Sequence, residues 1–221
     1  MKTHITTLFT LLVFTVFGQK EPYIPEPGEW LHFQSSTALL MGTPAGYTAD
    51  QKANSQGIML FSDRNFGFSP FSIGMGLGYS AHYYHGDHHI IVNPDGTYVL
   101  EDLEPGTYLK NRFGLEYADL ALELRYRSRA NNKGRYWRLY VGGLAGYKVD
   151  SYSYFQSQTQ RVKYYNIEGF NRFRYGVYAK FGRGPVNLYG YYGLSPLVTS
   201  GVLSPAWNEV TTANLGLSIT L

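Results

Sequence analysis

The sequence predicts an all-β protein, an eight-stranded antiparallel up-and-down transmembrane β-barrel, and three observations lead to this prediction. Apolar and polar residues alternate over stretches of about 9–11 residues, which is the length of a tilted membrane strand. The connections between these stretches are alternately short and long, as in outer-membrane barrels. The chain also has 21 Tyr, 13 Phe, three Trp and 25 Gly in 221 residues, and barrels place aromatic residues in girdles at the membrane interfaces.

The first four predicted strands cover residues 31–41, 56–63, 71–84 and 117–127. The third alternates most clearly, and its apolar face consists of Phe71, Ile73, Met75, Leu77, Tyr79, Ala81 and Tyr83. The opposite face includes Gly74, Gly76 and Gly78, which would weaken a soluble sheet but would leave room inside a narrow barrel. The first two strands alternate poorly, so ten strands remain an alternative to eight.

The next four predicted strands cover residues 136–149, 170–182, 186–194 and 209–221. The last one sets Asn214, Gly216, Ser218 and Thr220 against an apolar face of Ala213, Leu215, Leu217, Ile219 and Leu221. A closing strand of this kind suits recognition by the barrel-assembly machinery during insertion, although Leu221 stands where an aromatic residue is most common.

The predicted connections fix the expected orientation. Residues 64–70, 128–135 and 183–185 form short connections, whereas 42–55, 85–116, 150–169 and 195–208 form long ones. Outer-membrane barrels have short periplasmic turns and long external loops. We therefore expect the N- and C-termini in the periplasm and the long loops outside the cell. A secreted soluble sandwich or closed barrel is the alternative, with the apolar faces turned inward.

The N-terminus resembles an export signal. Lys2 is followed by a short apolar run over residues 5–17, and Gly18 is small enough for cleavage before Gln19. The predicted organisation is a signal peptide at 1–18, an extended periplasmic leader at 19–30 and a barrel domain at 31–221. The absence of Cys excludes disulfides and thiol chemistry. A net charge of +3 is too small to indicate nucleic acid as a partner.

One segment resembles a known family. Residues 111–126, with Tyr117, Asp119 and a Leu-rich stretch ending at Arg125, are similar to a recurrent strand of the PorT-like outer-membrane barrels of the Bacteroidetes. Ala121 replaces the Pro that is common there. Residues 141–147, 173–179 and the final strand are also similar, so the resemblance covers about 30–221. It implies a Gram-negative outer-membrane barrel and, from the family name, a role in type IX secretion.

A histidine-rich cluster raises the question of a metal site. His82, His85, Asp87, His88 and His89 lie within eight residues, and imidazole with carboxylate suits zinc, copper or nickel. The spacing matches no standard signature. The simpler interpretation is a solvated loop, extended as a hairpin through residues 90–100.

Charged residues on the polar faces of the predicted strands form a second candidate site. An eight-stranded barrel has an interior just wide enough for side chains, and charges there must pair or be hydrated. We expect them to form a network that fills the lumen, and a small polar pore is the alternative. The predicted members are Asp119, Glu123, Arg125, Arg138, Arg172, Arg174 and Lys180.

The sequence predicts no enzymatic activity and no cofactor. His82, His85, Ser80, Asp87 and Ser195 could converge at the rim, as in a lipid-modifying barrel enzyme, but nothing orders them as nucleophile, base and orienting group. The expected role is structural or partner-binding, with outer-membrane lipids and an envelope or secretion protein as partners. The Tyr- and Ser-rich residues 150–156 are typical of adaptable contact surfaces.

Overall fold

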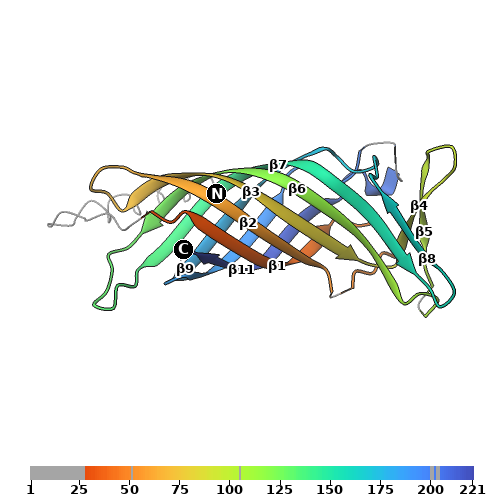
Figure 1. Cartoon of the computed structure of the whole chain (residues 1–221), viewed down its shortest axis with the longest axis horizontal. Helices are drawn as coiled ribbons and strands as arrows, with labels where there is room; N and C mark the ends of the chain where they lie inside the picture. The colour runs from red at the N-terminus through yellow and green to blue at the C-terminus, as the bar shows by residue number, and fades with distance from the viewer. Residues whose placement is uncertain (1–27, 51, 105, 200–201, 203–204) are drawn as a thin grey trace, which may run out of the picture.

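The computed structural model describes residues 28–221 except 51, 105, 200–201 and 203–204, and it shows an elongated barrel (Figure 1). The predicted signal peptide and most of the predicted leader therefore lie outside the described residues. The strands are β1 Leu31–Met41, β2 Asn54–Asn65, β3 Phe71–His85, β4 His88–Val92, β5 Tyr98–Asp102, β6 Lys110–Arg127, β7 Trp137–Gln156, β8 Arg161–Tyr165, β9 Phe173–Arg183, β10 Val186–Gly193 and β11 Thr211–Thr220.

Eight of these strands close into a ring, which confirms the predicted fold. Their order is β6-β3-β2-β1-β11-β10-β9-β7, and β6 also pairs with β7. Every pairing in the ring is antiparallel. The described residues include no helix long and apolar enough to cross a membrane.

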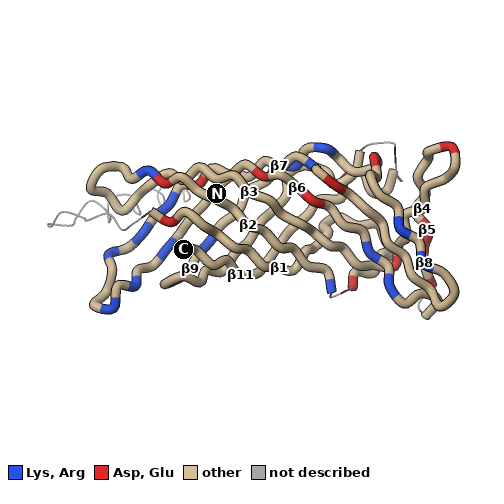
Figure 2. Tube along the Cα trace, viewed as in Figure 1, with Lys and Arg blue, Asp and Glu red and all other residues tan. Residues whose placement is uncertain are grey.

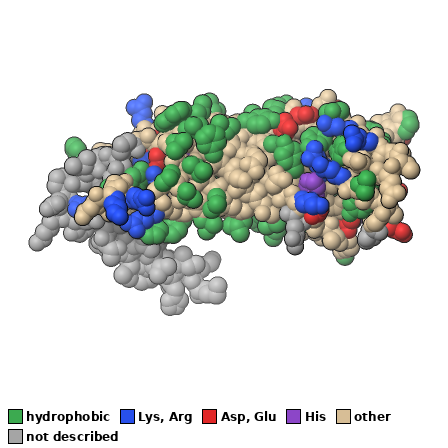
Figure 3. Space-filling model, turned by 60° about the horizontal axis from the view of Figure 1, so that its bottom comes forward, with side chains coloured by type: hydrophobic (Ala, Val, Ile, Leu, Met, Phe, Trp, Pro, Cys, Tyr) green, Lys and Arg blue, Asp and Glu red, His purple; other side chains and the backbone are tan. Residues whose placement is uncertain are grey.

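The residues that alternate along each strand face alternately outward from the barrel and into its lumen. On β3, Met75 is 60% exposed and Leu77 is 68% exposed, whereas the side chains of the inward residues Ser72, Ser80 and His82 are buried. Exposed hydrophobic side chains form a band around the outer surface (Figure 3), while Lys and Arg concentrate towards the two ends of the barrel (Figure 2). A soluble sandwich would bury these apolar faces, so the structure agrees with the membrane alternative.

Glycines on the inner face of β3 make room for large neighbours. A Cβ at Gly76 would lie 2.6 Å from the Phe61 ring, and one at Gly74 would lie 2.6 Å from Arg125 Nε. Real Cβ atoms do not approach other atoms this closely. The glycine-rich face therefore brings a phenyl ring and a guanidinium group against the barrel wall.

A bulge in β7 changes which residues face outward. Glu116 pairs with Asp150 and Tyr117 pairs with Lys148, so Val149 is the extra residue. An extra residue reverses the alternation beyond it. The strand then continues to Gln156, beyond the predicted end at residue 149. Residues 150–156, expected in a loop, are instead part of a strand, in which Ser151 faces inward and Tyr152 faces outward beneath the side chains of Arg112 and Lys163.

The long connections are folded and cap one end of the barrel. β4 and β5 form the predicted hairpin, β8 pairs with the extension of β7, and Pro205–Trp207 form a short 3₁₀ turn. They cover a buried hydrophobic cluster made of Ala38, Ala53, Tyr84, Ile90, Phe113, Leu115, Tyr117, Ile167, Phe170, Leu197, Val198, Trp207 and Val210. We call this the loop end.

The short connections lie at the opposite end, which we call the turn end. Gly134 and Gly184 have φ values of 68° and 69°, a conformation that favours glycine in tight turns. The backbone N–H of Trp30 donates to the carbonyl oxygen of Leu221 at 3.0 Å, so the chain enters and leaves the barrel side by side.

Candidate functional site

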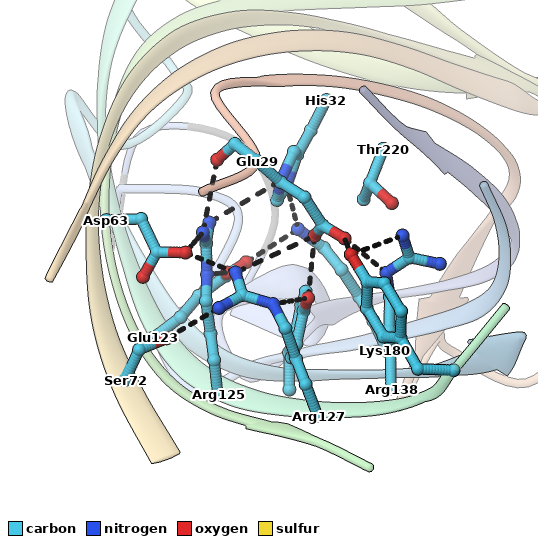
Figure 4. Close-up of polar contacts among 12 residues, drawn as sticks. Glu29, His32, Asp63, Ser72, Glu123, Arg125, Arg127, Arg138, Lys180 and Thr220 are labelled. Atoms are coloured by element: carbon cyan, nitrogen blue, oxygen red, sulfur yellow. Dashed lines mark hydrogen bonds and ion pairs between the residues drawn. The ribbon is translucent and has the colours of Figure 1, made fainter. Parts of the chain in front are cut away.

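The lumen near the turn end holds a dense network of buried charged side chains (Figure 4). The charged side chains come from four of the eight ring strands, β2, β6, β7 and β9, and from the segment just before β1, and they converge because each occupies an inward position. The charged members are Glu29, Asp63, Glu123, Arg125, Arg127, Arg138 and Lys180.

Glu123 accepts three hydrogen bonds, and its side chain has no exposed surface. Its Oε2 accepts from Arg125 Nε at 2.7 Å. Its Oε1 accepts from Lys180 Nζ at 2.6 Å and from the Tyr178 hydroxyl at 2.8 Å. Two cations and a phenol thus compensate one buried carboxylate, as an ion in such an environment requires.

Lys180 and His32 extend the network to β1. Lys180 Nζ lies 2.8 Å from His32 Nδ1, and both residues have no exposed surface. The His32 ring also packs at 4.3 Å, centroid to centroid, from Phe61. The lysine is thus held between a carboxylate and an imidazole.

Glu29 enters the lumen from the segment before β1, where the sequence predicted an extended periplasmic leader. It is 4% exposed. Its Oε1 accepts from Arg138 Nε and from the Tyr136 hydroxyl, and its Oε2 accepts from the Tyr140 hydroxyl at 2.6 Å. Glu29 lies outside any alternating stretch, so no sequence pattern marked it as inward.

Asp63 is the third carboxylate of the network and was also missed from the sequence. It pairs with Arg127 and, at 3.1 Å, with Arg125. Asp63 alternates with Met59 and Phe61 along β2, and both of these are buried. This spacing would have placed Asp63 inside, but the weak alternation of β2 as a whole hid the signal.

A second, smaller polar cluster lies nearer the loop end. Arg174 Nη2 contacts both carboxylate oxygens of Asp119 at 2.9 Å and the Ser80 hydroxyl at 2.8 Å. The Ser80 hydroxyl donates to Asp119 at 2.6 Å and lies 3.2 Å from His82 Nε2. The Arg174 guanidinium also stacks over Tyr117 at 4.1 Å.

This second cluster does not have the geometry of a hydrolytic triad. A triad needs a carboxylate that orients the histidine through its other ring nitrogen. His82 Nδ1 is buried without a hydrogen-bond partner among the described residues, and Asp119 binds the serine instead. Ser195, the other predicted serine, donates no bond to these residues and accepts from the Tyr175 backbone N–H at 3.1 Å.

Little free space remains around these groups. One cavity of about 10 Å³ lies beside Ser80, Asp119 and Arg174, and another of about 10 Å³ lies between Arg174 and Leu197. Each has room for about one water molecule.

The structure brings together six of the seven predicted lumen charges. Glu123, Arg125, Arg138 and Lys180 meet in the network at the turn end, and Asp119 and Arg174 meet in the second cluster. Arg172 does not join them. Arg172 precedes β9, which begins at Phe173, and it is exposed at the loop end. The alternation that turns Arg174 inward holds only within the strand.

The predicted histidine cluster is divided between different surfaces. His82 faces the lumen, His85 pairs across the sheet with Arg112, and His89 packs on Phe155 with ring centroids 4.6 Å apart. His88 contacts Asp87 at 2.8 Å and Asp102 at 3.0 Å. Within the part of the chain that the structure describes, no three His, Asp or Glu side chains are grouped to hold a metal ion.

Comparison with known proteins identifies a family. Residues 39–199 match the family model described as "Outer membrane protein beta-barrel domain". This match covers more than half of the chain. The chain belongs to that family. No curated protein and no solved structure matches it. The family, with the closed ring and its apolar outer band, places this barrel in the outer membrane.

The loop end of this outer-membrane barrel contains an open cleft. It has a volume of about 870 Å³ and lies between the β4–β5 hairpin, residues 168–175, residues 195–199 and Val202. Glu168 and Arg172 supply charges of both signs, and the aromatic side chains come from Tyr98, Phe170, Phe173 and Tyr175.

An acidic residue stabilises the neighbouring loop. Both carboxylate oxygens of Asp87 accept from the Thr48 backbone N–H, at 3.1 and 3.0 Å, and one contacts His88. Partial burial by itself would raise the pKa of Asp87, but these hydrogen bonds outweigh it and hold the pKa below its usual value. The loop therefore depends on an ionised Asp87.

Proposed function

We propose that this protein is a non-enzymatic outer-membrane barrel with a lumen closed to solutes, acting as a structural or binding protein through its loop end. The observation that carries the proposal is the filled lumen. Arg125, Glu123 and Lys180 have no exposed surface, and the cavities beside the second cluster hold about one water each.

The loop end supplies a second barrier. Its buried hydrophobic cluster includes Leu115 and Val210, each 0% exposed, and Phe170, 1% exposed. A solute that passed the charged network would also have to displace this packed cap. Both features favour a closed barrel over a small polar pore.

Conductance across a planar bilayer tests the closed lumen. We expect no steady current from the refolded barrel at concentrations where a porin reconstituted in the same way conducts. Steady open channels of uniform conductance would contradict the proposal.

The absence of catalysis is part of the same proposal. The buried Ser80, whose neighbour His82 lacks a carboxylate on its second ring nitrogen, supports it. Asp87 lies on a different surface, between β3 and β4, where it accepts a hydrogen bond from the Thr48 backbone. We expect no lipid hydrolysis by the refolded barrel in mixed micelles. Hydrolysis that disappears in His82→Ala, but not in a loop variant such as Glu104→Gln, would contradict this part.

The partner is proposed to be a protein of the cell envelope, with secretion or envelope assembly as the process. The cleft at the loop end supports a binding role, because it joins aromatic side chains to one acidic and one basic residue. The resemblance to PorT-like barrels supports secretion. With external loops, the cleft would face the cell surface.

Photo-crosslinking tests the partner directly. A photoreactive residue in place of Tyr98, which lines the cleft, is expected to crosslink one defined envelope protein in native membranes. The same residue in place of Trp137, which is exposed at the turn end, is the control. Equal products from both sites, or none from the cleft, would argue against a partner bound there.

A further inference from the structure

The outer sheet surface beyond the apolar band carries a cluster of cations and tyrosines that the proposed function does not use. The bulge at Val149 turns Tyr152 and Tyr154 of β7 outward, beside the outward residues of β6 and β8 with which they pair. Blue side chains gather around a histidine in the loop half of Figure 3. We call this surface the basic face and define it by Lys110, Arg112, Arg161, Lys163, Tyr83, Tyr152, Tyr154 and Tyr165.

Strand register fixes the spacing of the cations. Arg112 pairs with Tyr154, which pairs with Lys163 on the next strand. Lys110 and Arg161 flank Gln156 in the same way. Neighbouring strands lie about 4.8 Å apart and alternate residues about 7 Å apart. The four cations thus occupy the corners of a rectangle of roughly 10 by 7 Å.

Tyrosine rings hold the cations in place. The Arg112 guanidinium lies 5.5 Å from the Tyr152 ring centroid and 5.6 Å from those of Tyr83 and Tyr154. Lys163 Nζ lies 4.6 Å from the centroid of Tyr152. The Tyr152 ring lies flat across Gly114, where a Cβ would overlap it. The face is therefore preorganised.

The four cations have no acidic partner close by. Among the described residues, none of them forms an ion pair within 4.0 Å. Arg112 Nε is buried without a hydrogen-bond acceptor. The nearest carboxylate on β6 is Glu116, four residues or about 13 Å nearer the membrane. Asp150 lies opposite Glu116 on β7. Asp50 donates its backbone N–H to the carbonyl oxygen of His85, the neighbour of Arg112, and its carboxylate pairs with Lys52 at 3.6 Å. The face therefore keeps an excess of positive charge.

The height of the basic face above the membrane restricts its ligand. The apolar band ends at Ala118 on β6 and at Val149 on β7. Arg112 lies six residues beyond Ala118, which is about 20 Å along a strand and roughly 15 Å along the normal at a tilt of about 40°. Phospholipid headgroups extend only about 5–8 Å beyond the hydrocarbon. Anionic groups at this height belong to larger, sugar-containing headgroups.

We propose that the basic face binds the phosphorylated saccharide headgroup of an outer-leaflet glycolipid. Arginine and lysine match phosphate oxygens by charge and hydrogen bonding, and the tyrosines offer flat surfaces to sugar rings. The proposal rests on the outward orientation of the loop end in the proposed function, since only then does the face meet the outer leaflet.

The test titrates the barrel in zwitterionic detergent with lipopolysaccharide, with the same lipopolysaccharide after chemical dephosphorylation, and with phosphatidylglycerol. Wild-type barrel should prefer the phosphorylated form. The triple variant Lys110→Gln/Arg112→Gln/Lys163→Gln should bind that form about eightfold more weakly, because each exposed ion pair contributes a factor of about two.

The matched control is Lys133→Gln/Arg135→Gln, which removes exposed cations at the turn end and should leave affinity unchanged. If the triple variant does not refold, Lys110→Gln/Arg161→Gln removes two exposed cations and should weaken binding about fourfold. Equal binding of both lipopolysaccharide forms, wild-type affinity in the variants, or an equal loss with phosphatidylglycerol would overturn the proposal.

Failure of the glycolipid site is distinguishable from failure of the proposed function. Binding in detergent depends neither on orientation nor on conductance. Orientation is read separately, from antibody access in intact cells to an epitope placed in the turn of the β4–β5 hairpin.

Discussion

Replacing Glu123 by Gln strands a cation in the lumen and is expected to destabilise the barrel strongly. Lys180 would keep the His32 ring and the neutral amide oxygen of the glutamine as close hydrogen-bond partners, but it would lose the carboxylate with which it forms an ion pair. Removing one member of a buried ion pair costs about 3–5 kcal/mol. Arg125 keeps its ion pair with Asp63 at 3.1 Å. Lys180 is therefore the one cation that loses its anionic partner.

The cost of deprotonating Lys180 sets an independent upper limit on the destabilisation by Glu123→Gln, and it agrees with this range. The stranded lysine can lose its proton, and neutralising a lysine of ordinary pKa, about 10.4, at pH 7 costs about 4–5 kcal/mol. The penalty should not exceed that value. Because folded domains are stable by about 5–15 kcal/mol, the loss is a large fraction of the total.

The assay is reversible urea unfolding of the barrel in detergent or thin bilayers, followed by tryptophan fluorescence. The double variant Glu123→Leu/Lys180→Met removes both charges and should recover most of the loss, since an apolar pair of similar volume often replaces a buried ion pair without cost. Glu104→Gln, the same change at an exposed loop residue, should stay within about 0.5 kcal/mol. A loss below about 1 kcal/mol in Glu123→Gln, or a double variant worse than the single, would refute the reasoning.

Three further outcomes follow from the fold and the loop end. Leu122→Arg, at the centre of the apolar face of β6 and 51% exposed, should cost about 2–4 kcal/mol of unfolding free energy, since the side chain faces lipid at mid-depth. Gly76→Val should cost about 1–3 kcal/mol by overpacking, because a Cβ there lies 2.6 Å from a phenyl ring. Protection of the Thr48 amide from hydrogen exchange should be full above the unfolded pKa of Asp87, 3.8, and be lost as pH falls through its lower folded pKa.

Each of these three has its own control. Val99→Arg, at a residue of the β5 hairpin that is 47% exposed, should be nearly neutral, and equal losses at Val99 and Leu122 would argue against a lipid-facing Leu122. Gly190→Ala should not destabilise, as its Cβ would meet nothing within 4 Å. In Asp87→Asn the acid-dependent loss of Thr48 protection should disappear, and its persistence would assign the effect to another group.

The loop end shows where prediction from the sequence was partial. The hairpin over residues 90–100 was anticipated from its turn residues, and the structure has it as β4 and β5. The extension of β7 to Gln156 was not predicted, because the bulge at Val149 shifts the alternation of apolar and polar residues by one position. Tyr152 and Tyr154 face outward on the basic face because of that shift, and a fixed period extended along β7 would have placed them inside.

The sequence by itself determined the fold class and the inward position of most lumen charges, and it favoured eight strands over ten. Alternation with a period of two is a local property, and a strand with one apolar face must turn that face to lipid or to a core. Only the tertiary structure decided which charges meet. Glu123 contacts Lys180 because β6 and β9 flank β7, whose Gly142 leaves room between their inward side chains. Glu29 reaches Arg138 because the chain enters beside Leu221. Such contacts depend on ring closure and register, which are set by the whole barrel and not by any one strand.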